Sequence, residues 1–113
     1  MNPEVSPFNH ENVSTAKPSQ ATAPRSLNEQ LLWNEVLANP VAGRPLPGLN
    51  TDARFPVADG WIKMGMTHTL PDGKSISIHY QYNANTGKAY DVKLDSDIPS
   101  PIQPGVTIKG GNP

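Results

Sequence analysis

Side chains that can exchange protons or carry charge alternate with apolar residues across 74–94, KSISIHYQYNANTGKAYDVKL. His79 and Gln81 take alternate positions in the first half, and Asp91 and Lys93 do so in the second. A period of two is typical of strands with one packed face and one solvated face. The residues expected on the packed face are Ile76, Ile78, Tyr80, Tyr82, Tyr90, Val92 and Leu94. The string NANTG at 83–87 has the composition of a hairpin turn closed by glycine, so the sequence predicts a β-hairpin with one polar surface.

A third strand is predicted at 61–70, WIKMGMTHTL, joined to the hairpin by the turn residues PDG at 71–73. With unbroken alternation, Lys63 and Thr67 join the polar surface and His68 faces the other side. A bulge at Gly65 would reverse part of this assignment and turn His68 outward. His68 is therefore kept as an alternative partner for the site.

These residue types fit RNA cleavage without a metal, which needs a base near the 2′ oxygen, an acid for the 5′ oxygen and cations around the phosphate. His79 would be the general base or acid, while Lys63 and Lys93 would stabilise the negative charge. The candidate catalytic residues are His79, Lys63, Lys93, Thr67 and His68, and the candidate substrate-binding residues are Arg54, Gln81, Arg44 and Tyr82. The alternative is that a solvated sheet face ordinarily carries polar residues, a single histidine among them.

Arg44 and Arg54 lie in the proline- and glycine-rich stretch 42–60, which predicts an ordered loop. Either guanidinium could bind a phosphate through two hydrogen bonds. The competing interpretation is a local ion pair with Asp52 or Asp59.

A helix is predicted from about Leu27 to Ala38, because Ser26 and Glu29 form a capping-box pattern and Asn39-Pro40 ends the run. The apolar side chains expected to lie against the sheet are Leu27, Leu31, Leu32, Trp33, Val36 and Leu37.

The predicted fold is α+β, with one amphipathic helix packed on a three- or four-stranded antiparallel meander. Residues 1–25 have few large apolar groups and are expected to be a flexible lead-in, whereas 26–95 form the compact domain. Residues 96–113 are a Pro/Gly-rich tail in which 106–109 could add an edge strand.

Composition excludes several classes of site. The chain of 113 residues has no cysteine, which removes disulfides, thiolate ligands and a cysteine nucleophile. The absence of HxH, HExxH and nucleotide-binding glycine motifs leads us to expect no metal and no cofactor. No apolar run approaches the roughly 20 residues that span a bilayer, and the N-terminus resembles neither a signal peptide nor an anchor, so no membrane partner is expected. The net charge of -1 gives no overall attraction to nucleic acid.

The strings LWNEVLANPVAGRPLPGLNTDARFPVADGWIKM at 32–64 and IHYQYNANTGKAYDVKL at 78–94 resemble the C-terminal toxin regions of bacterial polymorphic and contact-dependent inhibition proteins. The similarity covers roughly 26–95, and DARFPVADGWIKM and IHYQYNANTGKAYD are its most specific parts. The resemblance implies an effector that is secreted or delivered from a producing bacterium and acts in the cytoplasm of a competitor. It also implies a cognate immunity protein.

Many such domains are ribonucleases of the barnase, colicin and RelE-like group, in which a sheet packed on one or two helices cleaves RNA, including tRNA. Two other functions stay open. One is a non-catalytic interaction or delivery module that binds a partner through Trp61, Tyr80 and Tyr82. The other is a toxin that acts on a protein or nucleotide target.

Overall fold

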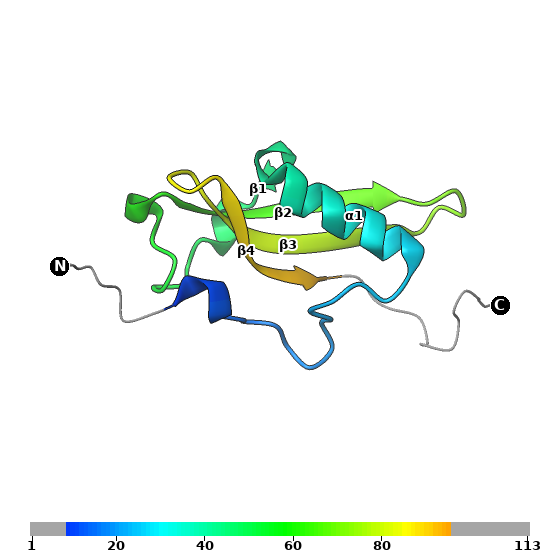
Figure 1. Cartoon of the computed structure of the whole chain (residues 1–113), viewed down its shortest axis with the longest axis horizontal. Coiled ribbons are helices and arrows are strands. Elements are labelled where there is room, and N and C mark those ends of the chain that lie inside the picture. Colours follow the sequence, from blue (N-terminus) through cyan, green and yellow to red (C-terminus); the bar gives the residue numbers. More distant parts are fainter. Residues whose placement is uncertain (1–8, 96–113) are drawn as a thin grey trace.

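One helix, α1 (Leu27–Ala38), lies along one side of a four-stranded antiparallel sheet in the computed structural model, which describes residues 9–95 (Figure 1). The strand order is β1-β2-β3-β4, and the elements are β1 (Arg44–Pro45), β2 (Trp61–Thr69), β3 (Ser75–Asn83), β4 (Lys88–Leu94) and the short helices η1 (His10–Asn12), η2 (Pro40–Ala42), η3 (Pro47–Leu49) and η4 (Val57–Asp59). The predicted α+β fold is confirmed. The fourth strand comes from the loop after α1, while the possible strand at 106–109 lies outside the described residues.

Strands β2 and β3 pair without interruption, from Trp61 opposite Asn83 to Thr69 opposite Ser75. There is thus no bulge at Gly65, and Lys63 lies on the side of the sheet that faces away from α1. His68 pairs with Ile76, a core residue, and so belongs to the α1 side.

The register shift occurs in β4 instead. Lys93 pairs with His79 and Tyr90 pairs with Gln81, so β4 has one more residue than β3 between these two pairs. Asp91 lies at this bulge with φ of 51°, a left-handed conformation that aspartate tolerates better than most side chains. The bulge corrects the expectation for Tyr90, whose ring lies 4.8 Å from that of Trp61 on the side away from α1.

The hydrophobic core lies between α1 and the sheet, and its buried residues are Leu32, Val36, Met64, Ile76, Ile78, Tyr80 and Leu94. Helix α1 has the predicted bounds, and the Ser26 hydroxyl accepts a hydrogen bond from the backbone N–H of Glu29 at 3.2 Å.

The buried face of α1 differs from the expected one. It contains Leu32, Val36 and Glu29, whereas Leu27, Leu31 and Leu37 are exposed by 53–75%. These buried positions follow helical spacing, but the first of them is an acidic residue and breaks the apolar pattern. Glu29 is buried because its carboxylate pairs with the Arg25 guanidinium, with an Nε–Oε1 distance of 3.1 Å.

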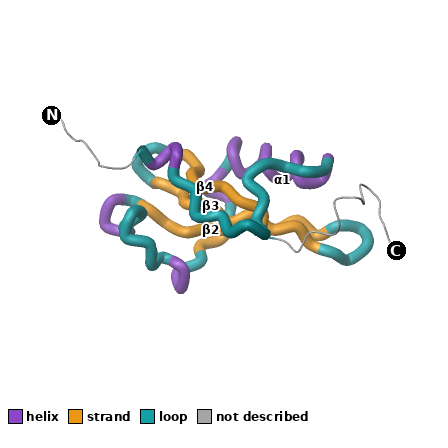
Figure 2. Tube along the Cα trace, turned by 90° about the horizontal axis from the view of Figure 1, so that it is seen from below, coloured by secondary structure: helices purple, strands orange, loops and turns teal. Residues whose placement is uncertain are grey.

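Residues 9–25, which we call the N-terminal strap, run beside β4 from η1 to the start of α1 (Figures 1 and 2). The backbone N–H of Leu94 donates to the carbonyl of Ala21 at 2.8 Å, and the His10 ring stacks near Phe55 and Trp61. For 9–25 the structure therefore differs from the expected flexible lead-in. Residues 1–8 and the predicted tail at 96–113 lie outside the described residues.

Candidate active site

Five polar residues meet on the side of the sheet away from α1. We call Lys63, His79, Gln81, Asp91 and Lys93 the polar cluster. Strands β2, β3 and β4 each contribute to it, as the alternation predicts. The structure does not leave this face open to solvent: Lys63, Gln81, Asp91 and Lys93 are exposed by 3–8%, and the His79 side chain by 20%. The cluster is thus a buried polar site.

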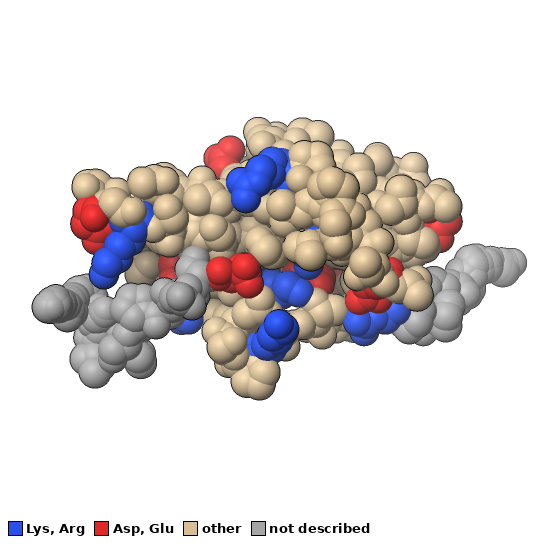
Figure 3. Space-filling model, turned by 180° about the vertical axis from the view of Figure 1, so that it is seen from behind, with Lys and Arg blue, Asp and Glu red and all other residues tan. Residues whose placement is uncertain are grey.

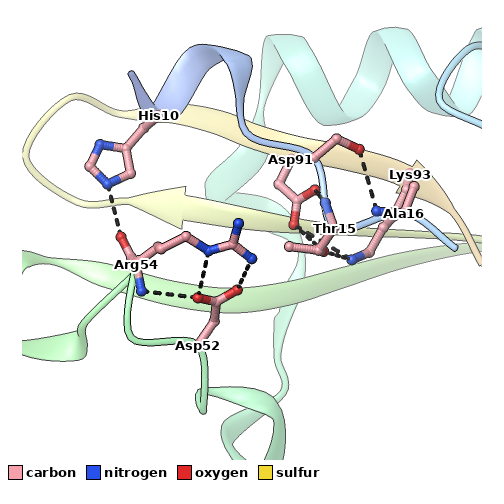
Figure 4. A network of polar contacts seen from close by, with 8 residues as sticks. His10, Thr15, Ala16, Asp52, Arg54, Asp91 and Lys93 are labelled. Carbon is pink, nitrogen blue, oxygen red and sulfur yellow. Dashed lines mark hydrogen bonds and ion pairs between the residues drawn. The ribbon is translucent and has the colours of Figure 1, made fainter. Parts of the chain in front are cut away.

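The N-terminal strap contributes a hydroxyl to this cluster (Figure 4). The Thr15 hydroxyl donates to Asp91 Oδ2 at 2.7 Å, and its backbone N–H donates to Asp91 Oδ1 at 2.8 Å. The same hydroxyl accepts a hydrogen bond from Lys93 Nζ, and Lys93 Nζ lies 3.5 Å from Asp91 Oδ2. Asp91 and Lys93 therefore form an ion pair with a hydroxyl bound between their charged groups.

Lys63 is the most strongly perturbed cation of the cluster. Burial and, to a smaller extent, the neighbouring Lys93 ammonium lower its pKa from 10.5 to about 8, while Asp91 opposes the shift. The backbone of Lys63 is fixed by the adjoining loop, since its N–H donates to Asn50 Oδ1 at 2.7 Å and its carbonyl accepts from Leu46 N–H at 2.8 Å. At pH 7 most of Lys63 is protonated, yet its pKa lies near enough for proton transfer.

His79 has a pKa below the usual 6.5 because it is partly buried. The Asp95 carboxylate, 3.4 Å from Nε2, opposes this shift, and Lys63, Lys93 and Arg44 reinforce it. The neutral imidazole therefore predominates at pH 7. Its ring lies against β2 at Gly65, where an added Cβ would be 3.3 Å from His79 Cδ2.

Gln81 supplies a polar atom with unused bonding capacity. Its Oε1 is buried and has no hydrogen-bond partner within residues 9–95. Because an unpaired buried acceptor costs stability, such an atom can gain from a donor on a bound molecule.

The two arginines lie differently with respect to the cluster. Arg44, in β1 opposite Gly65, is exposed and close enough to affect the charge on His79. Arg54 forms two side-chain hydrogen bonds with Asp52, at 3.0 and 2.8 Å, so the local ion pair weighed against phosphate binding is present. The hydrogen bond with Asp52 raises the pKa of the guanidinium, and the charge of Asp91 makes a smaller contribution in the same direction.

Three candidate residues are not brought into the cluster. Thr67 is on the correct side, but it is exposed and its hydroxyl lies 3.0 Å from Ser77 Oγ. His68 is exposed on the α1 side, and Tyr82 packs against the core on that same side. The strand phase explains the positions of His68 and Tyr82, since β2 and β3 pair without interruption, whereas Thr67 lies farther along β2, opposite Ser77.

Sequence reasoning missed Thr15 and Asp95. Thr15 lies 76 positions before Asp91, in an N-terminal stretch with no periodic pattern. The sequence therefore gives no indication that the two residues are in contact. Asp95 follows the last strand directly, and this position next to a strand with polar residues could have predicted that it lies near the cluster.

Positive and negative side chains are interspersed on the face opposite to that of Figure 1 (Figure 3). Within residues 9–95 there is no helix long and apolar enough to cross a membrane, and no group of three or more His, Cys, Asp or Glu side chains that could hold a metal ion. Comparisons with protein-family models, curated proteins and solved structures found no match to this chain.

Proposed function

We propose that this chain is a metal-independent endoribonuclease, the effector domain of a bacterial toxin that acts in the cytoplasm of a competitor. The observation that carries the proposal is the position of the His79 imidazole and the Lys63 and Lys93 ammonium groups on one side of the sheet, away from α1. A tRNA is one substrate class for such an enzyme. Its binding would require the strap to move, because Thr15 lies between two of the charged groups.

The proposed reaction is a transesterification. Neutral His79 accepts the proton of the 2′ hydroxyl, the 2′ oxygen forms a bond to phosphorus, and the bond from phosphorus to the 5′ oxygen breaks. The leaving oxygen takes a proton from the Lys63 ammonium, whose pKa of about 8 suits this role. Lys93 and Arg44 stabilise the charge on the phosphate oxygens. The products are a 2′,3′-cyclic phosphate and a 5′ hydroxyl.

A cognate immunity protein is the expected partner, because an active enzyme of this kind would damage the cell that makes it. Occlusion of the polar cluster would suffice for inhibition. Acidic groups would be favoured in such a partner, since they can pair with Lys63, Lys93 and Arg44.

Expression of the full chain in a bacterium without an immunity protein tests the proposal. Growth arrest with fragmented tRNA or rRNA is the expected result. Arrest with intact RNA would favour a toxin with another target, and unaffected growth would favour an interaction or delivery module. His79→Ala should lower RNA cleavage by at least about a hundredfold. His68→Ala, on the other side of the sheet, is the matched control and should retain cleavage.

A further inference from the structure

The contacts of Thr15 define the kind of group that fits between Asp91 and Lys93. The threonine oxygen donates one hydrogen bond to a carboxylate and accepts another from an ammonium. A hydroxyl can do both at once, whereas an N–H group can only donate and a methylene group can do neither.

We propose that Asp91 and Lys93 form a binding site for the ribose 2′-hydroxyl of a nucleotide next to the scissile one, and that Thr15 occupies this site in the free chain. The inference rests on the proposed ribonuclease function and names its recognition element. The 2′-hydroxyl is the group by which a protein distinguishes RNA from DNA. The site would therefore make the enzyme selective for ribose.

The backbone at Asp91 supports a role beyond anchoring the strap. Asp91 is the extra residue of the β4 bulge, and φ of 51° is unfavourable for a non-glycine residue. Such conformations concentrate at ligand-binding and catalytic sites. Nearby on the same face, Gln81 Oε1 is buried without a partner in the described part of the chain and can accept a hydrogen bond from the same ligand.

A hollow lies beside this position. It has a volume of about 400 Å³ and lies between the strap, β4 and α1, with Ser14, Trp33, Tyr90 and Asp91 among its lining residues. Small-molecule sites commonly have volumes of about 300–1,000 Å³. The Asp91 side chain is 1% exposed and is covered by Thr15, so a nucleotide in the hollow reaches the carboxylate only after the strap moves.

The middle of the strap can be displaced at moderate cost. His10 and Ala21 attach its two ends, next to Trp61 and Leu94 respectively. Between these ends the strap has no helix or strand beyond η1, and polar contacts such as Thr15 to Asp91 and Gln20 to Asp95 attach it to the sheet. Segments with few buried apolar contacts open at lower free energy than the core. Substrate would exchange one hydroxyl for another at Asp91 and Lys93, which keeps the polar partners satisfied.

The test measures binding by the full-length His79→Ala variant, in which cleavage is suppressed. The probes are a single-stranded RNA that the wild-type chain cleaves, or a mixed-sequence RNA if none is found, and the DNA of the same sequence. We expect RNA to bind at least about tenfold more tightly, because either strand must displace the strap and only RNA replaces the hydroxyl that Asp91 and Lys93 then lose. RNA should also accelerate hydrogen exchange of the Thr15 amide, which donates to Asp91 at 2.8 Å, more than DNA does.

Variants of the site sharpen this test. In the same background, Asp91→Gly should bring the RNA-to-DNA affinity ratio close to one, because glycine accepts the positive φ but has no carboxylate. If that chain does not fold, Asp91→Asn is the substitute and should lower the ratio severalfold. Thr15→Val should raise RNA affinity by vacating the site, whereas the exposed Thr51→Val is the matched control and should not.

Equal affinities for RNA and DNA, or a ribose preference that survives Asp91→Gly, would overturn the inference. Its failure can be separated from that of the proposed function by a cleavage assay on the wild-type chain. Cleavage together with an unchanged preference in Asp91→Gly leaves the ribonuclease and removes the hydroxyl site. A preference that depends on Asp91, without any cleavage, leaves the hydroxyl site and removes the ribonuclease.

Discussion

At the scale of single residues, Lys63 bears most of the free-energy cost of burying charge in the polar cluster. Its ammonium is buried beside a second ammonium, and its pKa is lowered to about 8. The folded state therefore binds fewer protons than the unfolded chain between about pH 8 and the ordinary lysine pKa of 10.5. Stability must rise with pH over this range, because the unfolded state binds more protons there.

This linkage predicts that the free energy of unfolding increases by about 1 kcal/mol between pH 7 and pH 9. Denaturant titrations at several pH values would measure it. Lys63→Met should abolish most of the increase and stabilise the protein at pH 7, whereas Lys88→Met, at an exposed position, should retain the increase. A wild-type stability that falls steadily over this range would contradict the prediction.

The proposed proton transfers predict a bell-shaped dependence of kcat/KM on pH. Activity should be lost as pH falls through the pKa of His79, below 6.5, because the base becomes protonated. It should also be lost as pH rises through about 8, because Lys63 loses its proton. Lys63→Arg should lower kcat/KM strongly, because arginine stays charged and cannot release the proton, and the residual activity should have no alkaline limb near pH 8. An activity that climbs from pH 7 to pH 9.5 would exclude Lys63 as the acid.

At the scale of elements, the connection from α1 to β1 packs directly on the side chain of Tyr80. The buried tyrosine hydroxyl donates to the carbonyl of Pro40 at 2.5 Å, and Gly43 lies directly beside it. A Cβ at Gly43 would be 2.0 Å from Tyr80 Oη and 3.0 Å from the carbonyl oxygen of Gly65. The loop that carries Arg44 can therefore approach the sheet because residue 43 has no side chain.

Gly43→Ala should destabilise the fold by about 1–3 kcal/mol, the usual cost of overpacking a buried contact. Thermal or denaturant unfolding would show this loss. Gly48→Ala is the control, because an added Cβ there meets nothing within 4 Å. Adding Tyr80→Phe to Gly43→Ala should recover part of the loss; equal stabilities of Gly43→Ala and Gly48→Ala would show that the loop moves aside freely.

The elements also show what the sequence could predict. Alternation predicts the side on which His79 and Gln81 lie. For β2 it does so only without a bulge at Gly65, and the uninterrupted pairing of β2 with β3 shows that there is none and that Lys63 lies on the same side. The buried face of α1 is predicted wrongly, because it includes Glu29. The ion pair of Glu29 with Arg25 permits this burial, and a search for apolar spacing does not detect such a pair. The bulge in β4 was missed as well, since no glycine marks it and an aspartate adopts the unusual backbone conformation.

At the scale of the whole molecule, the charge distribution favours RNA recognition by contacts at the polar cluster over long-range electrostatic attraction. The net charge is -1, and basic and acidic side chains are interspersed on the face shown in Figure 3. The N-terminal strap also differs from the predicted flexible lead-in. Its polar and backbone contacts join it to residues far away in the sequence, and such contacts leave no periodic pattern that could predict them.

RNA binding should consequently depend only moderately on salt. If Lys63, Lys93 and Arg44 contact phosphates, the slope of log K against log salt is about -2 for a single strand. The His79→Ala variant allows this measurement without cleavage, and Lys74→Met, at an exposed position in the β2–β3 turn, should leave the slope unchanged. A slope much steeper than this would mean that RNA is bound by a wider basic surface than the polar cluster.

Because Asp91 lies at the bulge in β4, it could be lost from the polar cluster without moving the other members. Tyr90 and Lys93 keep their pairings with Gln81 and His79 whether or not a residue is inserted between them, so Asp91 is an addition to an otherwise regular strand. Loss of a single codon would delete the carboxylate and leave its neighbours in place. Among related genes, a one-codon gap at this position would mark a change in chemistry, and not in architecture.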